Sequence, residues 1–202
     1  MRALILAGGQ GIRMRHILGH RPKALALIGD KPFLDYQLGW LLRHPVITDV
    51  TLCVGYLHQH ITDYYRARFA YSIEEEPLGT GGALKNVEPR LQDTFLVLNG
   101  DTYYEIDYAE LLQAHSRKGG MVTMALWPEL VNGGVYACEP ALLSYIRHGR
   151  FVSLEQDVLP VLDEKGLLQV HIAPGYHVDI GTLNEYTRAA RELPGRRNDL
   201  LL

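Results

Sequence analysis

The sequence has little cysteine and no strong excess of either charge, and each shortage narrows what the chain can do. Its 202 residues include two cysteines, Cys53 and Cys138, each inside an apolar run. Two thiols are too few for a metal cluster. We expect both to be reduced in the core of a cytoplasmic protein, with a buried disulfide as the alternative. The formal net charge of −3 implies no broad surface for a polyanion, which argues against nucleic acid as a partner.

Long hydrophobic runs are also missing. The opening apolar run, residues 3–7, is five residues long and ends in glycines. It is shorter than the apolar region of a signal peptide and far shorter than the roughly 20 residues of a membrane span. We therefore expect no membrane association. With 47% hydrophobic and 21% charged residues, the chain has the composition of a globular protein, and its length suits one domain better than two.

Several familiar catalytic motifs are absent. No serine stands in a G-x-S-x-G elbow, so a hydrolase nucleophile is not indicated. A dinucleotide fingerprint would need a third glycine where Met14 stands, and the Gly-Lys-Ser/Thr end of a P-loop does not occur. His58 and His60 form the one close pair among nine histidines. At a spacing of two on a helix they face different directions, which argues against a zinc site.

The sequence does contain a glycine-rich turn directly after an apolar run of strand type. Residues 3–7 lead into Gly8-Gly9-Gln10-Gly11, and the cations Arg13, Arg15, Arg21 and Lys23 follow. Glycines permit positive φ and carry no β-carbon, so backbone N–H groups can converge on an anion. This pattern favours a phosphate-rich ligand. The alternative is an ordinary strand and turn with solvated arginines.

Strand and helix patterns alternate along the chain, which predicts the fold class. We expect strands at residues 3–7, 50–54, 71–73, 94–98, 121–126, 135–138, 170–173 and 176–178. We expect helices at residues 32–42, 58–69, 107–116, 141–146, 154–162 and 183–192, and one more that begins within the turn at residues 74–82 and runs to residue 87. This order predicts an α/β fold in a single domain, with a Rossmann-like, doubly wound, mostly parallel mixed sheet flanked by helices. The domain is expected to span residues 1–193, and residues 194–202 are expected to form a fraying tail.

Four polar or glycine-rich clusters follow expected strands, at residues 8–15, 76–82, 99–102 and 179–182. Ligands of parallel sheets bind at the carboxyl ends of the strands, so we expect the four clusters on one rim. Asp101 and Asp179 are suited to hold Mg²⁺ there, since this ion prefers oxygen ligands and is bound through one or two carboxylates plus substrate phosphates. Each aspartate could instead cap a turn or a helix.

For several other glycine and polar residues, the sequence allows either a binding role or a purely structural one. The turn with Gly79, Gly81 and Gly82 could let the backbone approach a flat ring or could be a plain loop. Asn132 and Glu155 stand at the edges of apolar segments, where they could bind sugar hydroxyls or satisfy backbone groups. The run Glu74-Glu75-Glu76 is interpreted as a solvated face, although Glu76 adjoins the glycine turn.

Five motifs, taken in order, resemble those of the sugar-1-phosphate nucleotidyltransferases over nearly the whole chain. They are residues 6–14 with Arg21-Pro22-Lys23, residues 76–83, Asn99-Gly100-Asp101, residues 132–136 and residues 178–182. Within that family, residues 74–83, 97–103 and 153–157 look most like D-glycero-D-manno-heptose 1-phosphate guanylyltransferases, which supply GDP-heptose for cell-surface glycans. The resemblance implies a nucleotidyltransferase-like, GT-A-like version of the expected fold.

The resemblance also implies a role for each candidate residue. Leu6 is implied at the nucleotide. Gly8, Gly9 and Gly11 are implied at its phosphates, and Glu76, Gly79 and Gly82 near its base and ribose. Those implied at the reacting groups are Arg13 on the outgoing pyrophosphate, Lys23 at the α-phosphate and sugar phosphate, and Asp101 and Asp179 on Mg²⁺. Those implied at the sugar are Asn132 and Glu155.

The implied substrates are a nucleoside triphosphate, GTP for the subfamily, and a sugar 1-phosphate. A sugar-phosphate oxygen would attack the α-phosphorus in line and release pyrophosphate, with catalysis by positioning and charge neutralisation. A homo-oligomer stays open. The alternatives are a uridylyl- or thymidylyltransferase acting on another hexose 1-phosphate, a non-catalytic nucleotide-sugar-binding relative, and nucleotide transfer to another small acceptor such as a molybdopterin. Asn132 and Glu155 favour a sugar over the last of these.

Two stretches depart from the family pattern. The usual Thr-Arg-Leu end of the signature is Ile12-Arg13-Met14 here, which removes a hydroxyl and keeps the arginine. Between the strand ending at residue 126 and Asn132 the family usually carries an extra strand pair and a Glu-Lys-Pro-like turn. Here residues 127–131 alone intervene. We therefore expect the sugar side of the cleft to be more open.

Overall fold

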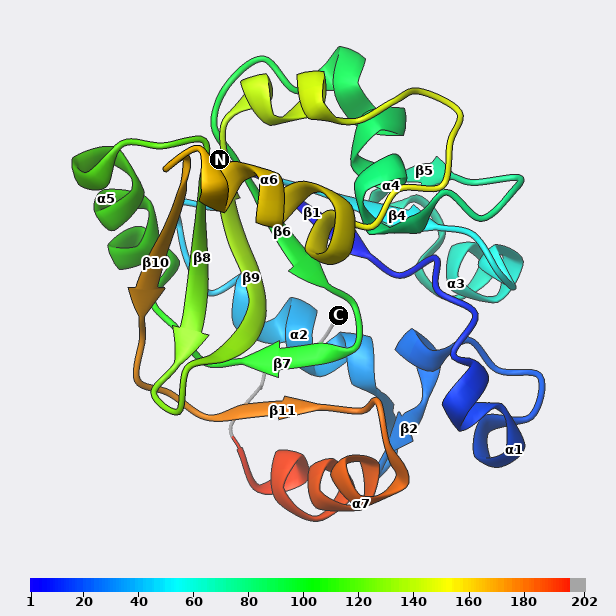
Figure 1. The fold of residues 1–202 in the computed structure, drawn as a ribbon. Coiled ribbons are helices and arrows are strands. Elements are labelled where there is room, and N and C mark those ends of the chain that lie inside the picture. The colour runs from blue at the N-terminus through cyan, green and yellow to red at the C-terminus, as the bar shows by residue number, and fades with distance from the viewer. Residues whose placement is uncertain (197–202) are drawn as a thin grey trace.

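The computed structural model describes residues 1–196, and a seven-stranded mixed sheet lies at its centre (Figure 1). The strand order is β10-β8-β9-β6-β1-β4-β5. Strand β9 is antiparallel to both of its neighbours, and the other pairs are parallel. The strands are β1 (Arg2–Leu6), β4 (Asp49–Val54), β5 (Ala70–Ile73), β6 (Phe95–Asn99), β8 (Val122–Trp127), β9 (Val131–Cys138) and β10 (Leu168–Ile172). The expected fold, a mostly parallel mixed sheet in a single domain, is confirmed.

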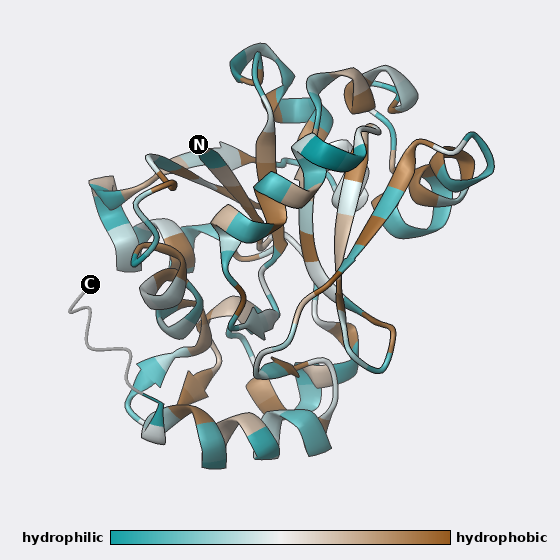
Figure 2. Ribbon diagram, turned by 90° about the vertical axis from the view of Figure 1, so that its left-hand side faces the viewer, coloured by the Kyte–Doolittle hydropathy of each residue, from teal (hydrophilic) through white to brown (hydrophobic). Residues whose placement is uncertain are grey.

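Helices cover both faces of this sheet (Figure 1). Helices α2 (Phe33–Leu41), α3 (His58–Tyr65) and α5 (Tyr108–Lys118) contribute to the hydrophobic cluster on one face. Helices α4 (Gly79–Val87) and α6 (Leu159–Glu164) contribute to the cluster on the other. Colouring by hydropathy shows apolar residues concentrated in the strands and polar residues on the outer faces of the helices (Figure 2). The sheet is therefore buried on both faces, as a parallel sheet requires.

The sequence explains where these elements begin and end. In β1, Ala3, Leu4 and Ile5 are fully buried, which a central strand covered on both faces demands. Helix α5 begins after Asp107, whose side chain accepts hydrogen bonds from the backbone N–H groups of the first turn. The same helix ends at Gly119, which has a φ of 65°.

A second, two-stranded antiparallel sheet lies beside the main one. It consists of β7 (Thr102–Tyr104) and β11 (His177–Asp179), and α7 (Leu183–Glu192) packs with it (Figure 1). We predicted a strand at residues 176–178, but it belongs to this small sheet, and β7 was not predicted. The pairing matters for the site because Asp179 lies opposite Thr102, next to Asp101.

Several predicted elements differ in type or extent. The helix expected at residues 141–146 is the 3₁₀ helix Pro140–Tyr145. The helix expected at residues 154–162 is divided into a π-helical turn, Leu154–Val158, and α6, because Pro160 has no N–H to continue an α-helical ladder. Helix α3 ends at Tyr65, where Arg66 takes a φ of 51°, and Arg66–Arg68 is a 3₁₀ turn. Strand β9 begins at Val131, so residues 132–134 lie inside the strand.

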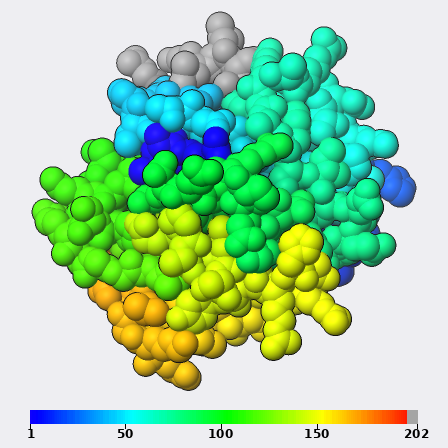
Figure 3. Space-filling view, turned by 90° about the horizontal axis from the view of Figure 1, so that it is seen from above, coloured from blue at the N-terminus to red at the C-terminus, as the bar shows by residue number. Residues whose placement is uncertain are grey.

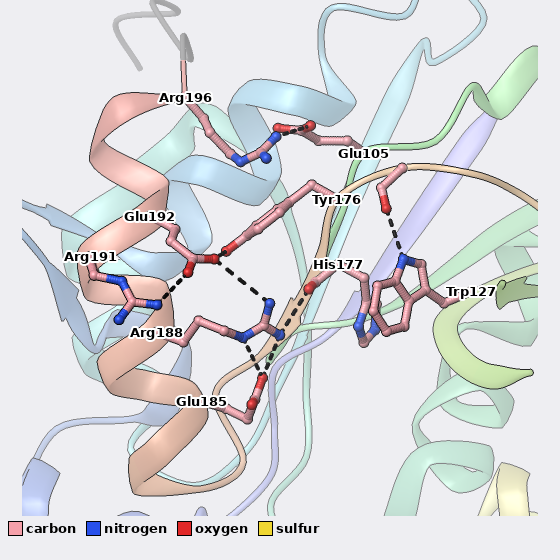
Figure 4. Close-up of polar contacts among 10 residues, drawn as sticks. Glu105, Trp127, Tyr176, His177, Glu185, Arg188, Arg191, Glu192 and Arg196 are labelled. Carbon is pink, nitrogen blue, oxygen red and sulfur yellow. Dashed lines mark hydrogen bonds and ion pairs between the residues drawn. The ribbon is translucent and has the colours of Figure 1, made fainter. Parts of the chain in front are cut away.

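The short stretch between β8 and β9 is a tight hairpin turn. Leu130 has a φ of 61°, and its N–H donates to the carbonyl of Trp127 at 2.8 Å. The Trp127 indole stacks on His177 with a centroid separation of 5.7 Å, and its Nε1 donates to the Gly175 carbonyl (Figure 4). The hairpin is therefore anchored to the small sheet by one aromatic side chain.

The end of the described chain is bound to the domain. Residues Leu193–Gly195 form a 3₁₀ turn, and Arg196 pairs with Glu105 at 2.6 Å (Figure 4). Residues 194–196 of the expected tail are thus ordered against the domain, and residues 197–202 lie outside the described part of the chain. Among the described helices, none combines the length and the apolar character that crossing a bilayer requires.

Candidate active site

A cleft of about 810 Å³ lies at the carboxyl ends of the central strands. All four polar clusters expected on one rim contribute to it, so their shared placement is confirmed. Its lining residues include Leu6, Gly8, Gly9, Gly11, Arg13, Lys23, Glu74, Gly79, Thr80, Asn99, Asp101, Ser153, Glu155 and Gly181.

The glycine-rich loop after β1 forms one wall of the cleft. Gly100 N donates to the carbonyl of Leu6 at 3.0 Å, so the end of β1 is fixed against the turn after β6. Gly11 has a φ of 56°, in the left-handed region that favours glycine. It precedes the 3₁₀ turn Ile12–Met14, whose Met14 is buried. This anchor holds the loop while the Arg13 side chain stays at the cleft.

Charged groups from three segments converge around Gly181. The Lys23 ammonium and the Asp101 carboxylate form an ion pair at 2.5 Å. A β-carbon on Gly181 would stand 2.7 Å from Asp179 Oδ1, 3.4 Å from Arg13 Nη2 and 3.7 Å from Lys23 Nζ. Two cations and two carboxylates therefore meet at one point of the rim. This is the arrangement that a phosphate group and a divalent ion would share.

Within residues 1–196, no group of three or more acidic, histidine or cysteine side chains converges as a complete metal cage. The two carboxylates at the rim, Asp101 and Asp179, are hard oxygen donors. A pair of this kind fits a hard divalent cation, which would also take substrate phosphate oxygens as ligands.

The glycine turn at the start of α4 packs tightly against the segment before the π-helical turn. A β-carbon on Gly79 would stand 2.5 Å from the Val152 carbonyl oxygen, which excludes a larger residue there. Gly81 N donates to the same carbonyl at 2.8 Å, and Val152 N donates to the carbonyl of Leu78 at 2.8 Å. Seen from above, the segment around residue 150 lies beside that around residues 80–90 (Figure 3). The glycines thus allow two distant segments to meet at the cleft.

Glu155 lies where these two segments meet. Its Oε2 accepts a hydrogen bond from Thr80 Oγ1 at 2.6 Å and a longer one from Ser153 Oγ at 3.3 Å. Its Oε1 has two distant donors, the Tyr136 hydroxyl at 3.3 Å and Asn99 Nδ2 at 3.5 Å. Burial and the nearby Glu155 charge raise the pKa of Tyr136, so its hydroxyl stays protonated as a donor. The carboxylate is oriented through Oε2.

Asn132 lies behind this carboxylate and does not line the cleft. Its Nδ2 donates to the Tyr136 hydroxyl at 2.8 Å, and its Oδ1 accepts from Gly134 N at 2.9 Å. Tyr136 in turn donates to Glu155. The structure therefore links the two predicted sugar-side residues through a tyrosine that we did not single out.

Glu74 is a cleft residue that sequence reasoning missed, and the interpretation of residues 74–76 as a solvated face is wrong at this position. Glu74 is 9% exposed, and burial raises the pKa of its carboxyl group. Its Oε2 accepts from Leu78 N at 3.0 Å, and its Oε1 faces Gly8. Strand β5 ends at Ile73, so Glu74 is the first residue beyond the strand and points inward rather than to solvent. Its position directly after an expected strand could have identified Glu74 as a cleft residue.

Asn99 is a second residue to which we assigned no role. Its carbonyl accepts from Gln37 Nε2 at 2.9 Å, which fixes the end of β6. Its side-chain Oδ1 is buried without a hydrogen-bond partner in the described structure. Because a buried acceptor without a partner is costly, this atom is a candidate for a hydroxyl group of a ligand.

The predicted site residues thus divide into two groups. Nine line the cleft, namely Leu6, Gly8, Gly9, Gly11, Arg13, Lys23, Gly79, Asp101 and Glu155. Asp179 lies beside the cleft next to Gly181, and Asn132 lies behind Glu155. Glu76 lines an adjoining cavity of about 310 Å³, which shares Glu74 and Gly8 with the cleft. Gly82 packs against the Arg150 carbonyl. The roles assigned to these residues remain predictions.

Sequence comparison places these features in a family. Residues 2–131 match the family model described as "Nucleotidyl transferase". A D-glycero-alpha-D-manno-heptose 1-phosphate guanylyltransferase of Aneurinibacillus thermoaerophilus is 33% identical, over 96% of this chain and 98% of the relative. A protein of the same name from Campylobacter jejuni is 42% identical over 116 residues, covering 55% of this chain and 52% of that protein. The first alignment spans 231 positions, more than the chain has residues, so that relative carries segments that this chain lacks.

Solved structures agree with this placement. HddC from Yersinia pseudotuberculosis superposes with a TM-score of 0.81 at 26% identity, over 94% of this chain and 97% of HddC. A second structure of HddC, described as complexed with GMP-PN, gives a TM-score of 0.80. The same arrangement of sheet and helices is therefore found in a protein that binds a guanine nucleotide.

The fold and the cleft define a nucleotide-dependent transferase, and the chain belongs to the nucleotidyl transferase family. The resemblance of its motifs to sugar-1-phosphate nucleotidyltransferases, and to heptose 1-phosphate guanylyltransferases among them, is confirmed by these comparisons.

Proposed function

We propose that this enzyme transfers GMP from GTP to D-glycero-α-D-manno-heptose 1-phosphate, giving GDP-heptose and pyrophosphate for surface glycans. The observation that carries the proposal is the cleft itself, which joins a cation-bearing glycine loop to the carboxylate of Glu155, whose Oε1 has only long hydrogen bonds. Two relatives named as heptose 1-phosphate guanylyltransferases support the choice of substrates. Since GTP is a cytoplasmic metabolite, we place the reaction in the cytoplasm.

Glu74 supports guanine as the base. An ionised carboxylate is an acceptor only. Guanine presents two neighbouring donors on its pairing edge, N1–H and the N2 amino group, whereas uracil and thymine present one. Because Glu74 lies at the wall shared by the cleft and the adjoining cavity, it can meet that edge of a base held against the glycine turn. The buried carboxylate would select guanine by leaving a poor match for the other bases.

The chemistry requires no covalent protein intermediate. An oxygen of the sugar phosphate attacks the α-phosphorus, the new P–O bond forms in line, and the bond to the β-phosphate breaks as pyrophosphate leaves. Lys23 would neutralise charge at the α-phosphate, where bond making and breaking meet. Arg13 would take up charge on the leaving pyrophosphate, while the backbone of the glycine loop orients the phosphates.

Enzymes of this family generally use a divalent metal ion. We propose Mg²⁺ for this one, held by Asp101 and Asp179 at the rim. When bound, the ion would supply charge neutralisation at the phosphate oxygens. The Lys23–Asp101 ion pair would set the position of the lysine relative to that carboxylate.

The test is a matrix of GTP, ATP, UTP and dTTP against heptose, mannose and glucose 1-phosphates, scored by pyrophosphate release with and without Mg²⁺. The proposal predicts that GTP with the heptose 1-phosphate has the highest kcat/KM. Turnover with a different pair would replace the substrates and keep the class. If no pair of substrates gives pyrophosphate release, a non-catalytic relative that binds a nucleotide sugar is favoured. The short β8–β9 hairpin supports that alternative.

A further inference from the structure

Thr80 occupies an unusual position between the two halves of the cleft. It belongs to the glycine turn at the start of α4, and it lines the cleft beside Gly79. Its Oγ1 donates to Glu155 Oε2 at 2.6 Å and accepts from Leu154 N at 2.8 Å. One hydroxyl therefore uses both its proton and an acceptor position to fix the segment that carries Glu155.

The other hydrogen bonds of Glu155 show why this contact decides the orientation of the carboxylate. Thr80 provides the short bond, and a hydrogen bond to an ionised group is shorter and stronger than a neutral one. Ser153 reaches the same oxygen at 3.3 Å, and the donors near Oε1 are at 3.3 and 3.5 Å. Oε2 is therefore held firmly and Oε1 only loosely, which leaves Oε1 free to accept from a ligand hydroxyl.

The backbone around Thr80 makes this a rigid junction. Gly81 N and Gly82 N both donate to the Val152 carbonyl, at 2.8 and 3.2 Å. These bonds fix the glycine turn against the segment that leads to Glu155. The Thr80 hydroxyl adds a direct contact to the carboxylate itself.

We propose that Thr80 is a positioning residue, which holds Glu155 in the orientation that receives the sugar. This inference rests on the proposed function, because it takes Glu155 as a contact of the sugar. Thr80 acts through Glu155 and not on the reacting atoms.

The test compares Thr80→Val, which keeps the shape and removes the hydroxyl, with Thr80→Ser, which keeps the hydroxyl. Loss of a hydrogen bond to a charged group predicts a rise in KM for the sugar 1-phosphate on the order of tenfold in Thr80→Val. KM for GTP should change by less than about twofold, because the lost hydrogen bond orients Glu155 and the proposed contact of Glu155 is the sugar. Thr80→Ser should restore the wild-type value. Thr187→Val, the same change on the exposed face of α7, is the matched control.

A double-mutant cycle separates an action through Glu155 from simple loosening of the turn. If Thr80 acts through Glu155, Thr80→Val should add little to the sugar KM of Glu155→Ala, which removes the acceptor, and the two changes should be far from additive. Thermal unfolding of each variant shows whether it folds. An unchanged sugar KM, an equal rise in both KM values, or full additivity with Glu155→Ala would overturn the inference.

Failure of the proposed function would look different. Wild-type enzyme that ignores heptose 1-phosphate and uses another sugar 1-phosphate would correct the substrate, and the same variants would then be compared with that sugar. Wild-type enzyme that turns over no sugar 1-phosphate would overturn both, since Glu155 would then have no sugar to receive.

Discussion

The two sides of the cleft are built in different ways. The proposed phosphate-binding part of the nucleotide side is one continuous loop after β1, with three glycines and an arginine within residues 8–13 and Lys23 close behind. The proposed sugar side is assembled from Thr80, Asn99, Tyr136 and Glu155, which come from four separate segments. The residues of the phosphate-binding loop are neighbours in the sequence, whereas the residues of the sugar side come together only when the chain folds. The nucleotide side should therefore tolerate changes in the β8–β9 hairpin better than the sugar side does.

The largest effect is expected where the two sides meet, at Lys23. Lys23→Ala removes the cation that would stabilise charge at the α-phosphate, and loss of one such contact costs on the order of 10²–10³ in kcat. The measurement is pyrophosphate release at saturating substrates. Lys165→Ala, which changes an exposed lysine outside the cleft lining, is the control for loss of one positive charge.

Lys23→Ala should remain folded, because the lysine pairs with a carboxylate that is 39% exposed. A normal thermal unfolding curve would check this. Full turnover in the folded variant would show that Lys23 does not stabilise charge at the α-phosphate.

A change confined to the nucleotide side should alter base choice. Glu74→Gln keeps the shape of the side chain and replaces one acceptor oxygen by a donor amide. We expect kcat/KM for GTP to fall by about 10–100-fold, the discrimination expected of one two-point base contact, while KM for the sugar 1-phosphate stays the same. Competition between GTP and UTP measures the change. Unaltered preference would remove Glu74 from base recognition.

A change confined to the sugar side should be milder at Asn132, which reaches Glu155 only through Tyr136. Asn132→Ala removes one neutral hydrogen bond, so we expect a rise of about two- to tenfold in the KM for the sugar 1-phosphate. KM for GTP should be unchanged in the same assay. A larger effect on GTP than on the sugar would contradict the division of the cleft.

The smallest effect concerns stability and pH, again at Glu74. Burial raises the pKa of its carboxyl group in the folded state above the unfolded value. The folded state therefore binds the proton more tightly, and the stability that this adds is present at low pH and is lost as the pH rises through the folded-state pKa. Glu74→Gln should remove that loss, so its free energy of unfolding should fall less between pH 4 and pH 7. Urea unfolding at several pH values would measure this, and parallel curves for the two proteins would contradict it.

Much of the nucleotide side could be predicted from the sequence alone. The alternation of strands and helices predicted a parallel sheet, and the position of each polar cluster after a strand predicted a shared rim, which the cleft confirms. Glu74 was misread because a run of three acidic residues has the composition of a solvated face. The strand end turns the first of them inward, and composition does not record that direction.

The sequence by itself determined the fold class, the glycine loop and its cations, because periodicity and consecutive residues carry that information locally. Only the tertiary structure decided which oxygen of Glu155 is held, how Asp101 and Asp179 come to lie side by side through the β7–β11 pair, and that Trp127 closes the short hairpin onto His177. These contacts join residues 50 to 80 positions apart. Their formation depends on how whole segments pack, which no local pattern specifies.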